Sequence, residues 1–225
     1  GQRVGNFIPF TDAYTVDDSA RFDEGDSDYL TKAGGTWGTS TDSEKCTISF
    51  WFKRGNTGDD EDDVLNWETT TSGQRDGVSF DNDLLTLRLD DGGSGLLKTT
   101  RAFTKTDGWT HALILIDTDA GTADADRIQI WINGVRETEF SGTQTQPSDN
   151  YPMEGFGQDT DCYIGTTVNV NDYYYDGYIA EFVFVDGDNI AASVFGQTDT
   201  STNRWIPKDL TSTLASASDF GTNGF

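Results

Sequence analysis

Apolar and polar residues alternate along much of this chain, and turn residues interrupt the alternation at about every tenth position. Residues 46–54 show the pattern well, because one parity holds Cys46, Ile48, Phe50 and Phe52. Successive side chains of a β-strand point to opposite faces, so this segment is predicted to be a strand with one buried face. Helical periodicity is almost absent. The pattern therefore predicts an all-β sandwich or barrel.

Further strands are predicted at residues 19–22, 29–31, 63–69, 77–80, 84–89, 96–100, 109–117, 127–132, 135–140, 162–166 and 178–185. The run 109–117 is almost continuously apolar, as expected of a central strand. Asn133-Gly134 predicts a tight hairpin after residue 132, because a type I′ turn needs two positive φ angles. A short helical turn is expected near residues 191–195. The tail from Ser212 is rich in Ser, Ala and Gly and is expected to be weakly structured.

The predicted fold is a two-sheet antiparallel jelly-roll β-sandwich of about a dozen strands. A chain of 225 residues suits one large all-β domain. We expect the sandwich to occupy residues 1–190. Residues 191–225 are expected to form a truncated C-terminal extension that can pack on the sandwich.

The chain is strongly acidic, with 15 basic and 39 acidic residues and a formal net charge of -24. Such a surface repels phosphate backbones and anionic bilayers, so we expect no nucleic-acid partner. We also expect no membrane insertion, because no apolar run approaches the length of a membrane span. No signal peptide is recognisable. The acidity indicates a solvated surface or, alternatively, a protein that binds cations.

The two cysteines, Cys46 and Cys162, lie in strand-like runs and share their parity with apolar neighbours. This is not the cysteine pattern of a disulfide framework, and it matches no metal-binding spacing. Two buried thiols are the favoured interpretation, and a single bridge between them is the alternative.

An ordered series of segments resembles the laminin-G-like, concanavalin A-like domains. The series comprises residues 19–22, 48–54, 109–117, 127–134, 162–165 and 175–181. Its most specific parts are Trp109-Thr110-His111 and the run Ile128–Gly134. The resemblance spans residues 17–190 and implies the concanavalin A-like jelly roll. It also implies that Ca²⁺ binds at a loop edge, as it does in many laminin-G-like domains.

A narrower set of segments is similar to virion proteins of marine bacteriophages, usually tail- or fibre-associated. The segments are 186–187, 195–196, 205–208 and 221–225. This resemblance implies a virion or extracellular location, and that the chain stops within a motif and is truncated. It implies other virion subunits as partners, in a homo-oligomer. It also implies a glycan or host-surface polysaccharide as the ligand.

Catalytic residues are not evident. Jelly-roll glycosidases carry two or three carboxylates at alternate positions of one strand, and hydrolysis needs an acid and a nucleophile or base. The best candidate strand, residues 178–185, offers Glu181 alone. His111 is the only histidine, and no serine in a nucleophile elbow accompanies it. We therefore expect structural roles for both residues and no catalytic site.

A Ca²⁺ site is the one metal site that the acidic loops allow, since Ca²⁺ accepts carboxylates, carbonyls and water together. Asp117 and Asp126 match the positions of the family best. No EF-hand spacing is met. The alternative is that Arg101 or Arg127 pairs with either acid in a purely structural role.

A sugar site needs an exposed aromatic ring beside polar groups, because sugars present apolar C–H faces and hydroxyls. The candidates are Asn171, Asp172, Tyr173, Tyr174 and Trp67. Three consecutive tyrosines at 173–175 cannot all point inward from a strand, so one or two should be exposed. The alternative is that these tyrosines pack within their loop and contact no ligand.

Other tryptophans are weaker candidates for sugar binding. Trp37 and Trp51 are aromatic residues that a ligand could meet. The alternative for Trp51 and Trp131 is that they lie on the second face of a sheet and pack under loops or a neighbouring chain.

The sequence thus favours a non-catalytic recognition or adhesion module that binds cell-surface carbohydrate. The first alternative is a structural virion protein that acts through protein–protein contacts without a sugar site of its own. The second is a divergent glycoside hydrolase.

Overall fold

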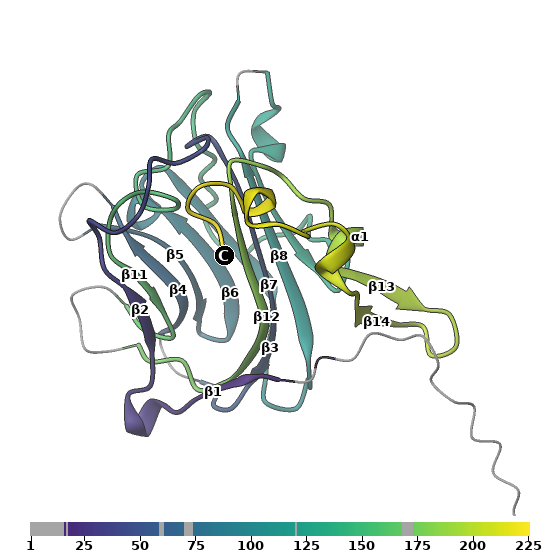
Figure 1. The fold of residues 1–225 in the computed structure, drawn as a ribbon. Helices are drawn as coiled ribbons and strands as arrows, with labels where there is room; N and C mark the ends of the chain where they lie inside the picture. The colour runs from purple at the N-terminus through teal and green to yellow at the C-terminus, as the bar shows by residue number, and fades with distance from the viewer. Residues whose placement is uncertain (1–15, 17, 59–60, 70–73, 120, 168–172) are drawn as a thin grey trace, which may run out of the picture.

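Two six-stranded antiparallel sheets pack face to face, and a short hairpin lies beside them (Figure 1). The computed structural model describes residues 16, 18–58, 61–69, 74–119, 121–167 and 173–225. Sheet A contains, in pairing order, β1 (Ala20–Phe22), β12 (Gly177–Asp186), β3 (Lys45–Arg54), β8 (Thr110–Asp117), β9 (Ile128–Ile132) and β10 (Val135–Arg136). Sheet B contains β2 (Leu30–Lys32), β11 (Cys162–Ile164), β4 (Glu61–Glu68), β5 (Arg75–Asp81), β6 (Leu84–Leu89) and β7 (Gly95–Ala102).

Regular structure outside the two sheets is sparse. The hairpin consists of β13 (Gly196–Asp199) and β14 (Arg204–Pro207), and it follows the short helix α1 (Ala192–Phe195). Single 3-10 turns occupy Glu24–Asp26, Asp90–Gly92, Asp124–Asp126, Leu210–Ser212 and Ala217–Phe220. Among the described residues, no helix has the length and apolar character needed to cross a membrane.

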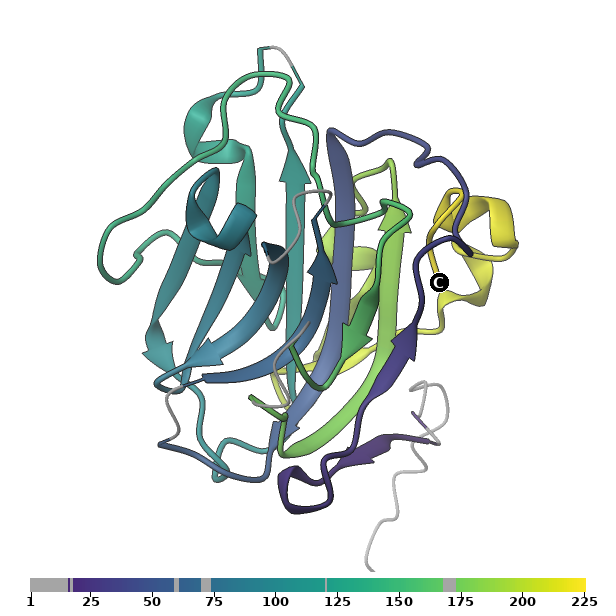
Figure 2. The same ribbon diagram turned by 90° about the vertical axis from the view of Figure 1, so that its left-hand side faces the viewer.

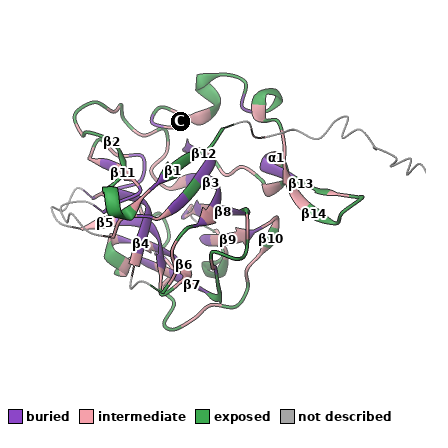
Figure 3. Cartoon of the chain, turned by 90° about the horizontal axis from the view of Figure 1, so that it is seen from below, coloured by how far each residue is buried: buried purple, intermediate pink, exposed green. Residues whose placement is uncertain are grey.

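Alternation along the strands places the apolar side chains between the sheets. On β3, the predicted inward residues Cys46, Ile48, Phe50 and Phe52 are all buried. Phe52 meets Phe80 of sheet B with ring centroids 5.0 Å apart. Figure 3 shows the same division, with buried segments on the strands and exposed residues in the connections. The aromatic core compensates for the low aliphatic content of the chain.

The predicted two-sheet jelly roll is confirmed, and the twelve strands of the two sheets match the expected dozen. Asn133 and Gly134 have φ angles of 49° and 76°, as the predicted hairpin requires. The returning strand is shorter than the predicted run 135–140, because β10 ends at Arg136. The chain then crosses towards sheet B, where Phe140 forms a bridge with Thr99.

The outer face of sheet A is covered by the C-terminal segment. Leu113, Val183 and Val185 point away from the main core and form a second apolar cluster with Phe195 and Leu214. Figure 1 shows this segment, coloured yellow, lying against β12. A sheet face that carries aliphatic side chains must be covered to remove them from water, and here the chain supplies its own cover.

The expectation of a weakly structured tail from Ser212 is wrong. Phe225 exchanges two backbone hydrogen bonds with Phe184 of β12, at 2.8 and 2.9 Å. The buried Asp186 carboxylate accepts hydrogen bonds from the backbone N–H groups of Thr41 and Asn223, at 2.9 and 3.1 Å. These contacts fix a segment whose Ser, Ala and Gly content predicted little order. The β13–β14 hairpin was also not predicted.

Both cysteines are buried free thiols, in line with the favoured interpretation. The Cys46 thiol donates to the sulfur of Met153 at 3.6 Å. Cys162 pairs in register with Trp67 on the inner side of sheet B. The burial of each thiol raises its pKa, which keeps it in the neutral form.

Candidate functional site

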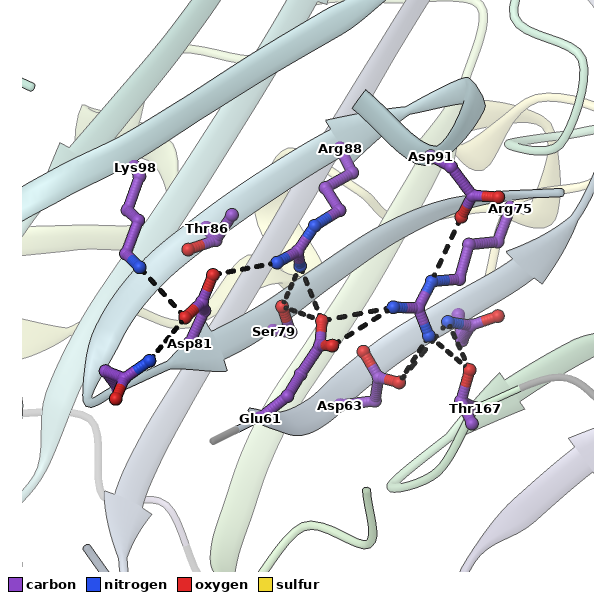
Figure 4. Close-up of polar contacts among 12 residues, drawn as sticks. Glu61, Asp63, Arg75, Ser79, Asp81, Thr86, Arg88, Asp91, Lys98 and Thr167 are labelled. Atoms are coloured by element: carbon purple, nitrogen blue, oxygen red, sulfur yellow. Dashed lines mark hydrogen bonds and ion pairs between the residues drawn. The ribbon is translucent and has the colours of Figure 1, made fainter. Parts of the chain in front are cut away.

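The outer face of sheet B carries charged and hydroxyl side chains at successive outward positions of four neighbouring strands. Figure 2 looks onto this sheet, and Figure 4 shows the side chains. We call this set the polar face; it consists of Glu61 and Asp63 on β4, Arg75, Ser79 and Asp81 on β5, Thr86 and Arg88 on β6, and Lys98 on β7. The strand register brings these side chains side by side, because paired residues of an antiparallel ladder project on the same side.

Arg75 is the centre of the polar face. Its NH2 group lies 3.2 Å from both carboxylate oxygens of Glu61, and its NH1 group lies 3.1 Å from Oδ2 of Asp63. Its Nε lies 3.3 Å from the Asp91 carboxylate, and its NH1 also donates to the Thr167 hydroxyl. One planar guanidinium thus joins three carboxylates, which its fork of N–H donors permits.

A second arginine extends the network across the sheet. Arg88 NH1 lies 2.5 Å from Oε1 of Glu61 and 2.6 Å from the Ser79 hydroxyl. Its NH2 lies 3.0 Å from Asp81, whose other oxygen lies 2.9 Å from Nζ of Lys98. Charges of alternating sign therefore run from β4 to β7, as Figure 4 shows.

Asp63 is the most deeply buried charged member of the network, with 1 % of its side chain exposed. Burial raises the pKa of Asp63 to about 7, although the charge of Arg75 opposes the rise. The Asn66 amide also lies 3.5 Å from Oδ2 of Asp63. Asp63 therefore changes its protonation state near neutral pH.

Three tyrosines form an aromatic strip on the same side of sheet B. Tyr29 lies between Tyr163 and Tyr174, with ring centroids 6.1 and 6.3 Å away. Tyr29 is 47 % exposed, and the other two rings are half-buried. Tyrosine rings exposed in this way offer apolar faces with polar tips, which suits contact with a sugar.

The aromatic strip and the polar face adjoin each other. Tyr163 pairs in register with Asn66, and the Asn66 amide donates to Thr167 at 3.2 Å and approaches Asp63. Tyr174 forms a backbone bridge with Asp63. The tyrosine rings and the polar face therefore lie on neighbouring strands of the same side of sheet B, as a carbohydrate site that combines apolar and polar contacts requires.

The predicted sugar-contact residues are only partly found on this surface. Tyr174 belongs to the aromatic strip. Tyr173 precedes it, is half-buried, and accepts a backbone hydrogen bond from Asp63 at 2.9 Å. Asn171 and Asp172 lie outside the described residues.

Trp67 does not offer a ring to a ligand, and this expectation is corrected. Its exposed fraction is 0 % because β4 turns it inward, where it packs against Trp37 with centroids 4.8 Å apart. Its indole N–H donates to the backbone carbonyl of Gln158 at 3.2 Å. Trp51 is also buried, beneath the C-terminal segment on the outer side of sheet A, as its alternative interpretation held.

The predicted Ca²⁺ ligands, Asp117 and Asp126, lie on β8 and on the turn before β9. Asp126 pairs with Arg136 at 2.6 Å, and Asp117 accepts hydrogen bonds from Asp119 and Thr122 of its own loop. Within the described ranges, no group of three or more His, Cys, Asp or Glu side chains is placed to hold a metal ion. Ca²⁺ binding stays a prediction, and an arginine does pair with one of the two acids, although it is Arg136 rather than Arg101 or Arg127.

Carboxylates at alternate positions lie on β4, not on the strand that the sequence favoured. Glu181 sits at a bulge of β12, where its φ angle is 48° and the register shifts. Glu61 and Asp63 instead share the outward side of β4. A glycosidase needs one carboxyl to protonate the leaving oxygen and another to attack or to activate water. Here Arg75 bridges both carboxylates, and Asp63 is almost completely buried.

His111 is buried beneath the C-terminal segment, as its expected structural role requires. The Trp205 indole N–H, which only donates, lies 3.2 Å from Nδ1 of His111, so Nδ1 must accept. Nε2 therefore carries the proton and donates to the Ser49 hydroxyl at 2.9 Å. In this tautomer His111 cannot take a proton from Ser49. Burial lowers the pKa of His111 to about 3, which keeps it neutral.

Most of the candidate surface was not found from the sequence. Tyr163 could have been found, since Cys162 and Ile164 on either side of it were expected to point inward. The Glu61 and Asp63 pair was obscured because β4 was expected to begin at Asp63. The role of Arg75 depends on pairing between β4 and β5, which sequence parity does not reveal.

Comparison with known proteins bears on the whole fold. A family model described as the concanavalin A-like lectin/glucanases superfamily matches residues 24–195. A Bacteroides ovatus protein described as a "putative carbohydrate binding protein" is similar in structure, with a TM-score of 0.53 and 14 % identity over 76 % of this chain and 44 % of that chain. Domains LG4-5 of the mouse laminin alpha1 chain give a TM-score of 0.49 and 8 % identity over 80 % of this chain and 44 % of that chain.

At these identities the structural likeness concerns the fold. This chain spans less than half the length of either protein. No curated protein sequence matches the chain. The resemblance to marine bacteriophage proteins stays a prediction.

Proposed function

The chain belongs to the concanavalin A-like lectin/glucanases superfamily, and from this premise we propose that it is a non-catalytic module that binds carbohydrate. The observation that carries the proposal is the aromatic strip of Tyr29, Tyr163 and Tyr174 beside the polar face of sheet B. The rings would stack on the C–H faces of a sugar. The partly exposed carboxylates of Asp81 and Asp91 would bind its hydroxyls.

The proposed setting is a virion or another extracellular surface, with host-surface glycan as the ligand. This part of the proposal rests on the sequence resemblance, and the acidic composition is compatible with it. Repeated copies in a homo-oligomer would raise the avidity of a weak single site. Ca²⁺ bound near Asp117 and Asp126 would lie on sheet A, away from the tyrosines, so its effect can be tested separately.

Replacing Tyr29 or Tyr174 by alanine is expected to weaken glycan binding about tenfold, because one stacking ring contributes roughly 1.4 kcal/mol. A glycan array identifies the bound sugars, and calorimetry on them measures the affinity of each variant. The matched control is Trp109→Ala, which removes an exposed aromatic ring next to the start of β8. The array is run with Ca²⁺ and with EDTA.

Two outcomes would contradict the proposal. One is an unchanged affinity in both tyrosine variants together with a loss in Trp109→Ala. The other is an array on which no glycan binds. If light scattering then reports a defined oligomer, the two results together would favour a structural virion protein.

A glycoside hydrolase is the second candidate function, and the alternating Glu61 and Asp63 pair is the observation that favours it. We expect no hydrolysis of the bound glycans, because Arg75 holds both carboxylates and Arg88 also holds Glu61. Reducing-sugar assays at pH 5 to 8 measure it. Release of sugar by the wild type that disappears in Glu61→Gln, while binding persists, would establish the hydrolase instead.

A further inference from the structure

We propose that the surface of sheet B selects uncharged, hydroxyl-rich sugars and rejects sugars that carry carboxylate or sulfate groups. The inference rests on the proposed function, because it concerns the ligand class of the same surface. It follows from two observations: the cations of the polar face already form ion pairs with carboxylates, and the surroundings of the aromatic strip are negatively charged.

Every cation on the polar face already has a carboxylate partner. Arg75 contacts three carboxylates, Arg88 contacts two, and Lys98 contacts one. Four carboxylates are involved, those of Glu61, Asp63, Asp81 and Asp91, against these three cations. An anionic sugar would therefore find no uncommitted positive charge among Arg75, Arg88 and Lys98.

Taking a guanidinium from its present partner would be costly. Asp63 is 1 % exposed and Glu61 is 12 % exposed, so water cannot replace a lost arginine contact. Removing one partner of a buried ion pair leaves an uncompensated charge, which costs several times more than a surface ion pair contributes. A carboxylate ligand would gain one contact and break another.

A neutral sugar avoids this conflict. Hydroxyl groups both donate and accept, so they can add hydrogen bonds to the lone pairs of Asp81 and Asp91 without separating an ion pair. Asp81 and Asp91 keep a quarter or more of their side chains exposed. Partly exposed carboxylates of this kind accept hydrogen bonds from the hydroxyls of a sugar.

The aromatic strip adds negative charge rather than positive charge. The Tyr163 hydroxyl donates to Asp161 at 3.4 Å, and the same carboxylate accepts from the Gly34 backbone N–H at 2.6 Å. Lys32, on the adjacent strand β2, is turned to the other side of the sheet, where its Nζ lies 3.5 Å from the centroid of the Trp37 ring. The net charge of -24 further disfavours the approach of an anionic polysaccharide.

The test uses matched sugars. Hexasaccharides of glucose, galactose and mannose are compared in three forms: native, oxidised at C6 to the carboxylate, and with that carboxylate methyl-esterified. We expect at least one native sugar to bind, its C6 carboxylate to bind about tenfold more weakly or not at all, and the methyl ester to recover the affinity. The ester separates the effect of charge from the loss of the C6 hydroxyl.

The outcomes distinguish the two proposals. Equal or tighter binding of the carboxylate form would overturn the inference on ligand class and leave carbohydrate binding intact. Binding of none of the three forms of any sugar would count against the proposed function itself.

A variant tests the cause. Asp91→Asn removes the half-exposed partner of Arg75 Nε and is expected to reduce the discrimination against the carboxylate form several-fold. The matched control is Asp124→Asn on the 3-10 turn before β9, where Asp124 is the exposed partner of Arg127. If Asp91→Asn keeps its thermal stability and still discriminates equally between the native and carboxylate sugars, the pairing of Arg75 with carboxylates is not the cause of the selectivity.

Discussion

Replacing Arg75 by alanine is expected to lower the free energy of unfolding by about 3 kcal/mol. This is the largest effect that we expect from any single substitution on the outer face of sheet B. The variant leaves Asp63 and Glu61 close together with no guanidinium between them, and both are largely shielded from water. Urea denaturation, followed by tryptophan fluorescence, measures the change. Sugar binding should fall as well, since Arg75 holds the polar groups of the site in place.

Two further variants make the Arg75 result interpretable. Arg21→Ala removes an exposed arginine that pairs with Asp23, so it should change the stability by less than about 1 kcal/mol. Adding Asp63→Asn to Arg75→Ala should recover part of the lost stability, because it removes a buried carboxyl that must otherwise stay charged without a partner or take up a proton. An Arg75→Ala variant as stable as Arg21→Ala would mean that the network contributes nothing.

Stability should depend on pH through two buried groups that act in opposite directions. The pKa of His111 is lowered to about 3 from 6.5, so His111 stabilises the fold above pH 6.5 and this contribution is lost as the pH falls towards 3. The pKa of Asp63 is raised to about 7 from 3.8, so its ionisation destabilises the fold as the pH rises from 3.8 to 7. Each group changes the stability by at most about 1.4 kcal/mol per pH unit.

The difference in stability between the wild type and a variant isolates each group, because all other titrations cancel. Between pH 4 and 6.5, the advantage of the wild type over His111→Gln should grow by about 3 kcal/mol. Over the same range, its advantage over Asp63→Asn should shrink by a similar amount. If the advantage of the wild type over both variants rises, or falls, with pH, the direction of the pKa shift of His111 or of Asp63 is wrong. NMR titration of the His111 ring, which should stay neutral to pH 4, provides a check that needs no variant.

The fold was predictable because it depends on alternation. The inward residues of β3 and both ends of β6 at Leu84 and Leu89 follow from parity and turn residues alone. The C-terminal segment was not predictable in this way. Its order comes from contacts distant in sequence, such as Asp186 with Asn223, which no local pattern encodes.

The site was less predictable than the fold, for a related reason. The bulge between Asp63 and Leu65 breaks the parity of β4, so an alternation rule assigns Asp63 and Asn66 to opposite faces. Tyr29, Tyr163 and Tyr174 come from three separate segments, and only Tyr174 lay in the loop that composition singled out. Strand pairing, rather than any motif, assembles this surface.

The C-terminal cover over sheet A has a consequence for how the molecule would act on cells. With Leu113, Val183 and Val185 sealed beneath that segment, the proposed sugar surface lies on only one of the two broad sides of the sandwich. A single copy would then attach to one cell or particle at a time and would not clump two together. Agglutination by this protein would require an assembly that points sheet B in more than one direction.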